Sequence, residues 1–222
     1  MQNVSTHRTD YFVIGLIGIF FLLFKILHAW YGFHWEFAAG FSYGLYAIAL
    51  LYSVLSRNRF LQKVLIFGML AGLTELISDW WLVDVKESLV YPLNEPLLWA
   101  SPLYMPVSWA VIFLQIGGLS YWVYEKKNLS YARVVALLCG LLFVPFFEYW
   151  AGVEGWWYYQ HCAMVLGKVP WYIIFSEAAI CFVLPDLMIR IANRNTGFCI
   201  LAGIGQGLWI WFTCMIAYYF SA

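Results

Sequence analysis

Two carboxyl groups four residues apart are the first feature of this sequence that could do chemistry. Glu75 and Asp79 lie in the apolar stretch LTELISDWWLVDV at residues 73–85. A spacing of four places both side chains on one face of a helix. A carboxyl group in hydrocarbon costs about 2.5–3.5 kcal/mol on insertion scales, so acids in such a helix indicate a function or a buried partner. We therefore take both as candidates for proton transfer.

Three further acids, Glu36, Glu148 and Glu177, begin, end or interrupt other apolar runs. Apolar surroundings favour the neutral form of a carboxyl group. One acid could then donate a proton to a substrate while a second, ionised carboxylate takes a proton back. The sequence does not assign these roles. The alternative is that Asp79 and Glu36 are solvated at an interface, and that the other acids hold helices together through hydrogen bonds.

Aromatic residues accompany the acids, and they make up 21% of the chain. Aromatic faces stabilise positive charge by about 0.5–2 kcal/mol per contact. If these rings point inward, they would line a cavity suited to a cationic intermediate. The predicted substrate-binding residues are Trp80, Trp81, Trp109, Trp156, Trp157, Tyr158 and Trp171.

The composition is that of a membrane protein. Of the 222 residues, 64% are hydrophobic and 11% are charged, whereas soluble domains are about 45–50% apolar and about 25% charged. The formal net charge is zero and there is no basic cluster, which argues against a nucleic-acid partner. We expect the lipid bilayer and a lipophilic small molecule as partners, in a bacterial inner membrane or a eukaryotic endoplasmic-reticulum membrane. The oligomeric state is not indicated.

Seven apolar runs, separated by short polar or Pro/Gly segments, predict an all-α bundle of about seven transmembrane helices in a single domain, residues 1–222. Each run is close to the roughly 20 residues that a bilayer requires. The predicted helices span residues 11–30, 36–55, 61–83, 100–124, 133–152, 169–189 and 197–220.

Lysine and arginine are distributed unevenly between the two predicted sides. Nine lie in the N-terminal segment or in the connections 2–3, 4–5 and 6–7, against two, Lys86 and Lys168, on the opposite side. The positive-inside rule then makes the N-terminus cytoplasmic. The membrane acids gather toward the other side, except Asp186, which could pair with Arg190 one turn later.

A weak internal repeat relates predicted helices 3–4 to predicted helices 5–6. An acid and a Trp-Trp pair end the first helix of each pair, and the second helix begins with matching Pro, Tyr, Ser and Ala residues. In this register Pro102 matches Pro170, and Trp109 matches Glu177. Parallel duplications of this kind occur in membrane folds. Chance similarity in so aromatic a chain is the alternative.

Neither a metal nor another cofactor is expected. His34 and Glu36 are two residues apart, so a helix would turn them to different faces. There is no H-E-x-x-H motif. A Schiff base of the retinal type would need a lysine in the last helix, and residues 197–220 contain none.

Two short motifs resemble membrane enzymes that act on isoprenoids. Trp35-Glu36-Phe37, in a small seven-helix chain, resembles the integral-membrane meroterpenoid cyclases, and the run PLYMPVSW at residues 102–109 is similar to membrane carotenoid hydratases. The cyclase resemblance implies protonation of an epoxide or alkene by an acid matching Glu36. The cyclases carry a second acid near the last helix, which is absent here, so Glu75 or Glu148 would have to supply it.

We therefore expect a membrane-embedded enzyme that uses acid–base chemistry to cyclise, hydrate or isomerise a lipophilic isoprenoid. A proton-coupled transporter or a lipid-binding membrane protein is the main alternative. An accessory subunit whose acids only join helices is the third. An enzyme predicts carboxyl groups that point into one aromatic cavity, a transporter predicts discontinuous helices, and a scaffold predicts paired carboxyl groups without a cavity.

Overall fold

Six helical segments are long and apolar enough to span a membrane within residues 35–92 and 94–221, the part of the chain that this computed structural model describes. They confirm the all-α class, and each matches a predicted helix; the predicted helix 11–30 lies outside the described residues. The segments are α2 (Trp35–Leu55), α3 (Arg59–Trp80) with η1 (Trp81–Val85), α4 (Met105–Lys126), α5 (Leu129–Leu138) with η2 (Cys139–Phe143) and α6 (Val144–Glu154), α7 (Trp171–Phe182) with α8 (Leu184–Asn193), and α9 (Thr196–Ser221).

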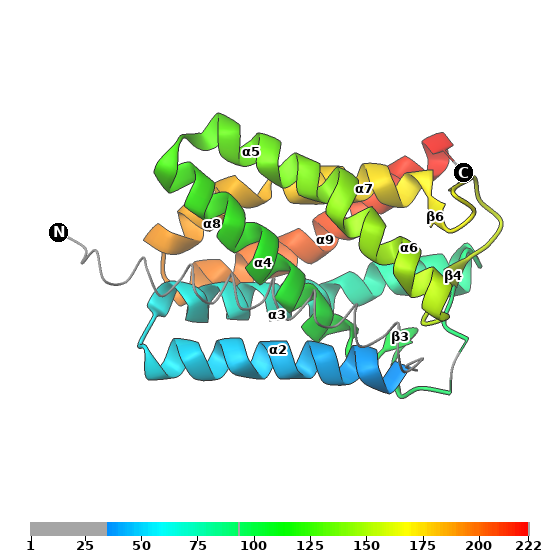
Figure 1. Cartoon of the computed structure of the whole chain (residues 1–222), viewed down its shortest axis with the longest axis horizontal. Helices are drawn as coiled ribbons and strands as arrows, with labels where there is room; N and C mark the ends of the chain where they lie inside the picture. The colour runs from blue at the N-terminus through cyan, green and yellow to red at the C-terminus, as the bar shows by residue number, and fades with distance from the viewer. Residues whose placement is uncertain (1–34, 93, 222) are drawn as a thin grey trace.

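Helix α3 lies between α4 and α9 and packs most extensively against these two (Figure 1). Small residues allow the close approach. A Cβ atom added at Gly68 would lie 2.8 Å from the Ala110 backbone of α4, and one at Gly203 would lie 2.5 Å from the Phe67 carbonyl oxygen. The helix that carries Glu75 and Asp79 is therefore fixed on two sides.

Two spans change helical pitch near acids. The span 129–154 becomes π-helical over Cys139–Phe143, immediately before Val144 and Pro145. Proline has no N–H group to continue the α-helical ladder, so the wider turn sits where hydrogen bonding is already interrupted. The second π segment, Trp81–Val85, directly follows the end of α3. Both lie within a few residues of a candidate acid.

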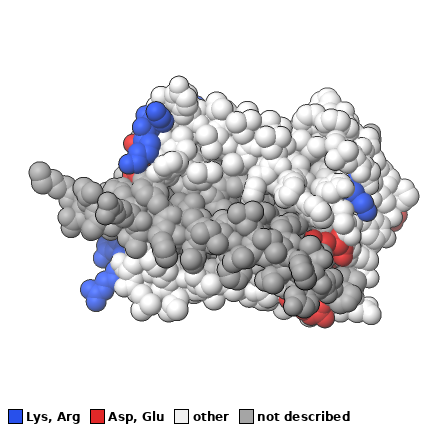
Figure 2. All heavy atoms as spheres, viewed as in Figure 1, with Lys and Arg blue, Asp and Glu red and all other residues white. Residues whose placement is uncertain are grey.

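The two ends of the bundle differ in charge. The connections α2–α3, α4–α5 and α8–α9 meet at one end, which we call the basic end, where Figure 2 shows lysine and arginine side chains. Asp186 also lies toward this end. It accepts two hydrogen bonds from Arg133 of α5, at 2.6 and 2.9 Å, so the expected pairing with Arg190 is wrong. The helical spacing allowed Arg190, but the packing of α5 supplies a guanidinium that binds both carboxylate oxygens.

The opposite end, which we call the loop end, carries the two long loops 86–104 and 155–170. Strand β1 (Leu89–Val90) of the first loop pairs antiparallel with β4 (Tyr158–Tyr159) of the second. Each loop then forms a short hairpin: β2 (Leu97–Leu98) with β3 (Ser101–Pro102), and β5 (Met164–Val165) with β6 (Val169–Pro170). Because Ser101 and Pro102 belong to a strand, α4 begins at Met105 rather than at residue 100 as predicted.

Candidate functional site

A cavity opens inside the bundle toward the loop end. It encloses about 820 Å³ of space not filled by atoms, a figure that includes open solvent at its mouth. Its walls come from α2, η1, both long loops and the helices that carry four of the five predicted acids. The residues that line it include Ser42, Glu75, Asp79, Tyr91, Tyr104, Ser108, Trp109, Ile112, Glu148, Trp156, Trp157, Tyr159, Ser176 and Glu177.

Four of the predicted acids line this one cavity: Glu75 and Asp79 from α3, Glu148 from α6 and Glu177 from α7. Glu75, Asp79 and Glu177 are 3%, 6% and 5% exposed. The fifth, Glu36, is exposed in the first turn of α2 and does not line the cavity. The structure therefore brings together four acids that are up to 102 positions apart in the chain.

Asp79 is held by the first loop. Its Oδ2 atom accepts a hydrogen bond of 2.7 Å from the Tyr91 hydroxyl and a second one from the Ser101 hydroxyl. Burial, together with the carboxyl groups of Asp79 and Glu75, raises the pKa of Tyr91 well above its ordinary value, so Tyr91 remains a neutral donor. Two donors on one oxygen favour the ionised form of Asp79.

Glu148 is held in the same way by the second loop. Its Oε2 atom accepts hydrogen bonds of 2.8 Å from the Trp157 indole N–H and the Tyr159 hydroxyl. Burial and the Glu148 carboxyl group raise the pKa of Tyr159, which keeps this hydroxyl protonated as well. Asp79 and Glu148 thus each accept two hydrogen bonds at one carboxyl oxygen.

The carboxyl groups of Glu75 and Glu177 have less complete hydrogen bonding. The Oε2 atom of each is buried without a hydrogen-bond partner among the described residues. Glu75 interacts with the Asp79 carboxyl group and with the Trp109 indole. Buried polar atoms are almost always paired in native proteins, and an exception calls for an explanation such as a catalytic role or a bound molecule. Both residues line the cavity, so a bound molecule is one such explanation.

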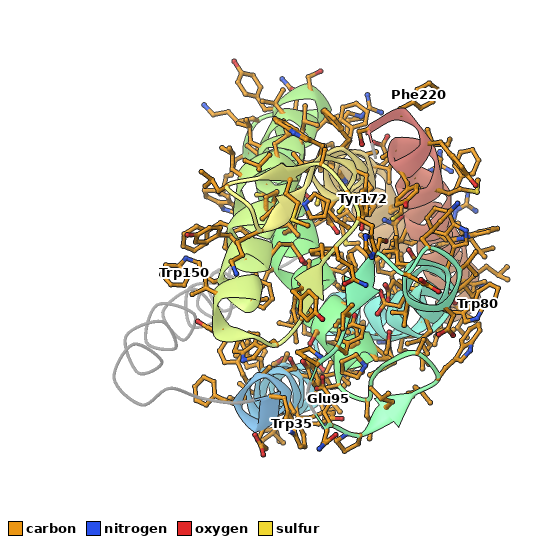
Figure 3. The ribbon with its side chains drawn as sticks, turned by 90° about the vertical axis from the view of Figure 1, so that its right-hand side faces the viewer. Trp35, Trp80, Glu95, Trp150, Tyr172 and Phe220 are labelled. Atoms are coloured by element: carbon orange, nitrogen blue, oxygen red, sulfur yellow. The ribbon has the colours of Figure 1, made fainter. Side chains whose placement is uncertain are left out.

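The aromatic residues divide into two groups. Trp109, Trp156 and Trp157 line the cavity and are buried. The other predicted substrate-binding residues do not line it. Trp80 stacks on Trp99 at 5.4 Å, Trp81 packs against Tyr218, Tyr158 is 40% exposed, and Trp171 stacks on Phe175. Viewed from the loop end, Trp80 lies at the periphery of the ring of helices and Tyr172 lies inside it (Figure 3).

A second, apolar space adjoins the acid-lined cavity between α2, α4 and the η2–α6 segment, and we call it the apolar arm. The two share several wall residues, including Ser42, Ser108 and Ile112. The hydroxyl groups of Ser42 and Ser108 are hydrogen-bonded at 2.6 Å where the spaces meet. The arm continues along α4 to Gln115, seven residues beyond Ser108 and therefore roughly 10 Å farther along the helix.

The two halves of the site have matching parts. Pro102 and Pro170 each lie in the second strand of a hairpin, and Tyr104 and Tyr172 are each buried at the start of the following helix. Ser108 and Ser176 line the cavity, as do Trp109 and Glu177. The sequence register therefore aligns residues that occupy similar places. The hydrogen bonds from the two loops make Asp79 the counterpart of Glu148.

Several polar residues of the site escaped the sequence reasoning. Tyr91, Ser101, Tyr104 and Tyr159 lie in loops, where one tyrosine or serine among many gives no signal of its own. The spacing was the available clue, because Tyr91 follows Asp79 by 12 residues and Tyr159 follows Glu148 by 11. Recognising it requires knowing that the two loops pair.

No group of three or more His, Cys, Asp or Glu side chains within the described ranges is placed to hold a metal ion. The cavity carboxyl groups are instead bonded to hydroxyl and indole donors or face open space.

The fold and the cavity define an all-α protein with at least six apolar helices that can cross a membrane and an internal site rich in carboxyl and aromatic groups. Residues 76–221 match the family described as Domain of unknown function (DUF6989), and the chain belongs to that family. The matched range contains Asp79, Glu148 and Glu177, and Glu75 immediately precedes it. No curated protein and no solved structure matches the chain.

Proposed function

We propose that this protein is a membrane-embedded enzyme that protonates a lipophilic isoprenoid and steers the resulting carbocation to cyclisation, hydration or isomerisation. One observation carries the proposal: four carboxyl groups from three spans, two of them with an unpartnered oxygen, line one cavity that also has three tryptophans in its wall. An accessory protein whose acids only join helices would have no reason to keep such oxygens buried at an open space.

The hydrogen bonds support a division of roles. Asp79 receives two donors, which favour its ionised form, so we assign the proton of the pair to Glu75, which interacts with it. Glu75 donates this proton to a substrate alkene; a C–H bond forms, the π bond is lost, and Glu75 becomes a carboxylate. Glu148, with two donors of its own, takes a proton from the carbon next to the cation, which restores an alkene.

Glu177 is the remaining acid of the cavity. Its unpartnered oxygen can bind a polar group of the substrate, or the water that attacks the cation if the reaction is a hydration. Trp109, Trp156 and Trp157 supply the aromatic faces that stabilise positive charge. A dry, aromatic space also prevents bulk water from capturing the cation early.

The apolar arm supports an elongated substrate. Its walls are almost entirely apolar and it joins the carboxyl-lined cavity at the Ser42–Ser108 pair. A hydrocarbon chain lying along α4 would place one end among the acids and the rest in the arm. We further propose seven transmembrane helices, related in part by the internal repeat, with the basic end toward the cytoplasm, because lysine and arginine remain on that side of a membrane.

The test is deuterium incorporation from solvent. Membranes from cells that produce the wild-type protein are incubated in D₂O buffer after the lipids have been made, and their lipid extracts are compared by mass spectrometry with those of Glu75→Gln, Glu148→Gln and Asp84→Asn cells. Asp84 is exposed on η1 and provides the control on the same span. We expect deuterated isoprenoid products in wild-type and Asp84→Asn cells, and at least about a hundredfold less in the other two, the usual loss for a removed acid or base.

Equal product in all four strains would contradict the enzyme proposal. A transporter predicts a different result, in which purified protein in vesicles moves protons across the membrane when a lipophilic cation such as tetraphenylphosphonium is added. Proton movement of this kind without any chemical change in the lipids would favour the transporter.

A further inference from the structure

Another buried carboxyl group, Glu95, lies in the first loop outside the membrane-spanning segments. It is 8% exposed, and neither of its carboxylate oxygens has a hydrogen-bond partner among the described residues. Its neighbours Asn94 and Pro96 are exposed, so the side chain points inward from a surface loop. Figure 3 places it at the loop end, close to the first turn of α2. A buried acid without a partner calls for an explanation.

Glu95 is linked to the cavity through Tyr104. The Tyr104 hydroxyl interacts with the Glu95 carboxyl group, although it does not reach the geometry of a full hydrogen bond. Tyr104 is 3% exposed, lines the cavity just before α4, and also interacts electrostatically with Asp79. Tyr104 is therefore the residue of the cavity wall with which Glu95 interacts.

A catalytic cycle that consumes the proton of Glu75 requires a source for the next one. Tyr91 and Ser101 donate their hydrogen bonds to Asp79, and Ser101 is completely buried. Glu95 is one residue away from exposed positions on both sides. Glu95 therefore combines three properties: its side chain is buried, its neighbours are exposed, and it interacts with a hydroxyl group of the cavity wall.

We propose that Glu95 and Tyr104 form a proton-entry route into the cavity. Glu95 takes a proton from water at the loop end and gives it to the Tyr104 hydroxyl, which releases its own proton toward the Glu75–Asp79 pair. Each transfer breaks one O–H bond and forms another, so Tyr104 ends as it began. The route would resupply the proton donor Glu75, and this role rests on the proposed function.

The electrostatics of the loop support this role. Burial raises the pKa of Glu95 to about 7, the neighbouring Glu36 carboxyl group acts in the same direction, and Tyr104 acts weakly against both. A group that is half-protonated near neutral pH can both accept and release a proton. The titratable groups that interact with Glu95 in the described structure are Glu36 from α2 and Tyr104 at the start of α4.

The route can be tested without a substrate. Purified protein in lipid bilayers is transferred from H₂O to D₂O, and infrared spectroscopy follows the shift of the C=O stretching band of protonated carboxyl groups. The band of the Glu75–Asp79 pair is identified by its loss in Glu75→Gln. We expect its exchange to slow by roughly tenfold to a hundredfold in Glu95→Gln and in Tyr104→Phe, which remove proton-transfer groups. Asp84→Asn should exchange like the wild type, and Glu95→Asp should recover most of the rate.

Wild-type exchange rates in Glu95→Gln or in Tyr104→Phe would overturn the proposal. Both variants nearly preserve side-chain shape, and an unfolding temperature close to that of the wild type shows that the fold is intact. Because no lipid product is measured, the route can fail while the deuterium test of the enzyme succeeds, and the reverse also holds.

Discussion

Asp79 and Glu148 accept hydrogen bonds from tyrosine hydroxyls of two loops that pair with each other. Tyr91 immediately follows strand β1, and Tyr159 lies in strand β4, its antiparallel partner. Each carboxyl group accepts a second hydrogen bond as well, so the two helix ends are joined to the strand pair in chemically equivalent ways, although the register pairs Tyr159 with Leu89 rather than with Tyr91. The carboxyl groups thus take part in joining the helices to the loops as well as lining the cavity.

This equivalence predicts matched effects of two substitutions. Tyr91→Phe and Tyr159→Phe each remove one hydrogen bond to a buried carboxylate, which typically costs about 1.5–3 kcal/mol. We expect both to lower the thermal unfolding temperature of the protein in detergent, measured by tryptophan fluorescence, and to do so by similar amounts. Tyr158→Phe is the control, because its side chain is exposed next to Tyr159. Loss of stability in only one of the two variants would contradict the equivalence.

A second prediction concerns the contact between α9 and α3. A Cβ atom added at Gly207 would lie 2.6 Å from the Ala71 carbonyl oxygen and 3.0 Å from the backbone nitrogen of Glu75, whereas one at Gly205 would meet nothing within 4 Å. Gly207→Ala should therefore destabilise the protein by about 1–3 kcal/mol through overpacking. Gly205→Ala on the same helix should leave the unfolding temperature unchanged or higher. Equal unfolding temperatures for the two variants would contradict this prediction, because they would show that α9 and α3 can move apart without loss of stability.

The pH dependence of stability should report on Glu95. Its pKa in the folded protein, about 7, is higher than the ordinary glutamate value, so the folded state holds the proton more tightly than the unfolded state does. The stabilising effect of that proton is complete at low pH and is lost as the pH rises through about 7. We expect Glu95→Gln to unfold at a higher temperature than the wild type at pH 8 and at a similar temperature below the ordinary glutamate pKa. A constant difference across this range would contradict the assignment.

The apolar arm predicts a limit on chain length. Ile112 belongs to the walls of both the arm and the acid-lined cavity, so Ile112→Trp should fill the point where they meet. Lipids that co-purify with the variant, identified by native mass spectrometry, should have shorter chains or be absent. Leu51→Trp adds the same bulk at a position that is 60% exposed and should retain the wild-type lipids. Identical lipids in both variants would show that the arm does not hold the chain.

The sequence predicts the helices well because hydrophobic length is a local property. Bounds such as 36–55 and 197–220 differ by at most one residue at each end from α2 and α9. The candidate acids could be identified from the sequence for a similar reason, because a carboxyl group in an apolar run is unusual. Their convergence on one cavity, and the exclusion of Glu36 from it, depend on how the helices pack, which no single segment encodes.

The aromatic residues were harder to assign. Trp80 and Trp81 are adjacent to each other and close to Asp79 in sequence, yet neither lines the cavity. Successive residues on a helix point about 100° apart, so proximity to an acid in the chain does not give a shared direction. Trp156 and Trp157 do line it, because they lie in a loop that folds back over the helix ends. The roles of tyrosines 91, 104 and 159 likewise depend on loop pairing.

The pairing of β1 with β4 restricts how a molecule can reach the cavity. Each loop supplies walls of the cavity, and the strand pair ties the two loops together across it. Neither loop can lift away alone without breaking backbone hydrogen bonds and the tyrosine–carboxylate contacts beneath them. We therefore expect the two loops to move together when a large molecule enters or leaves the cavity at the loop end.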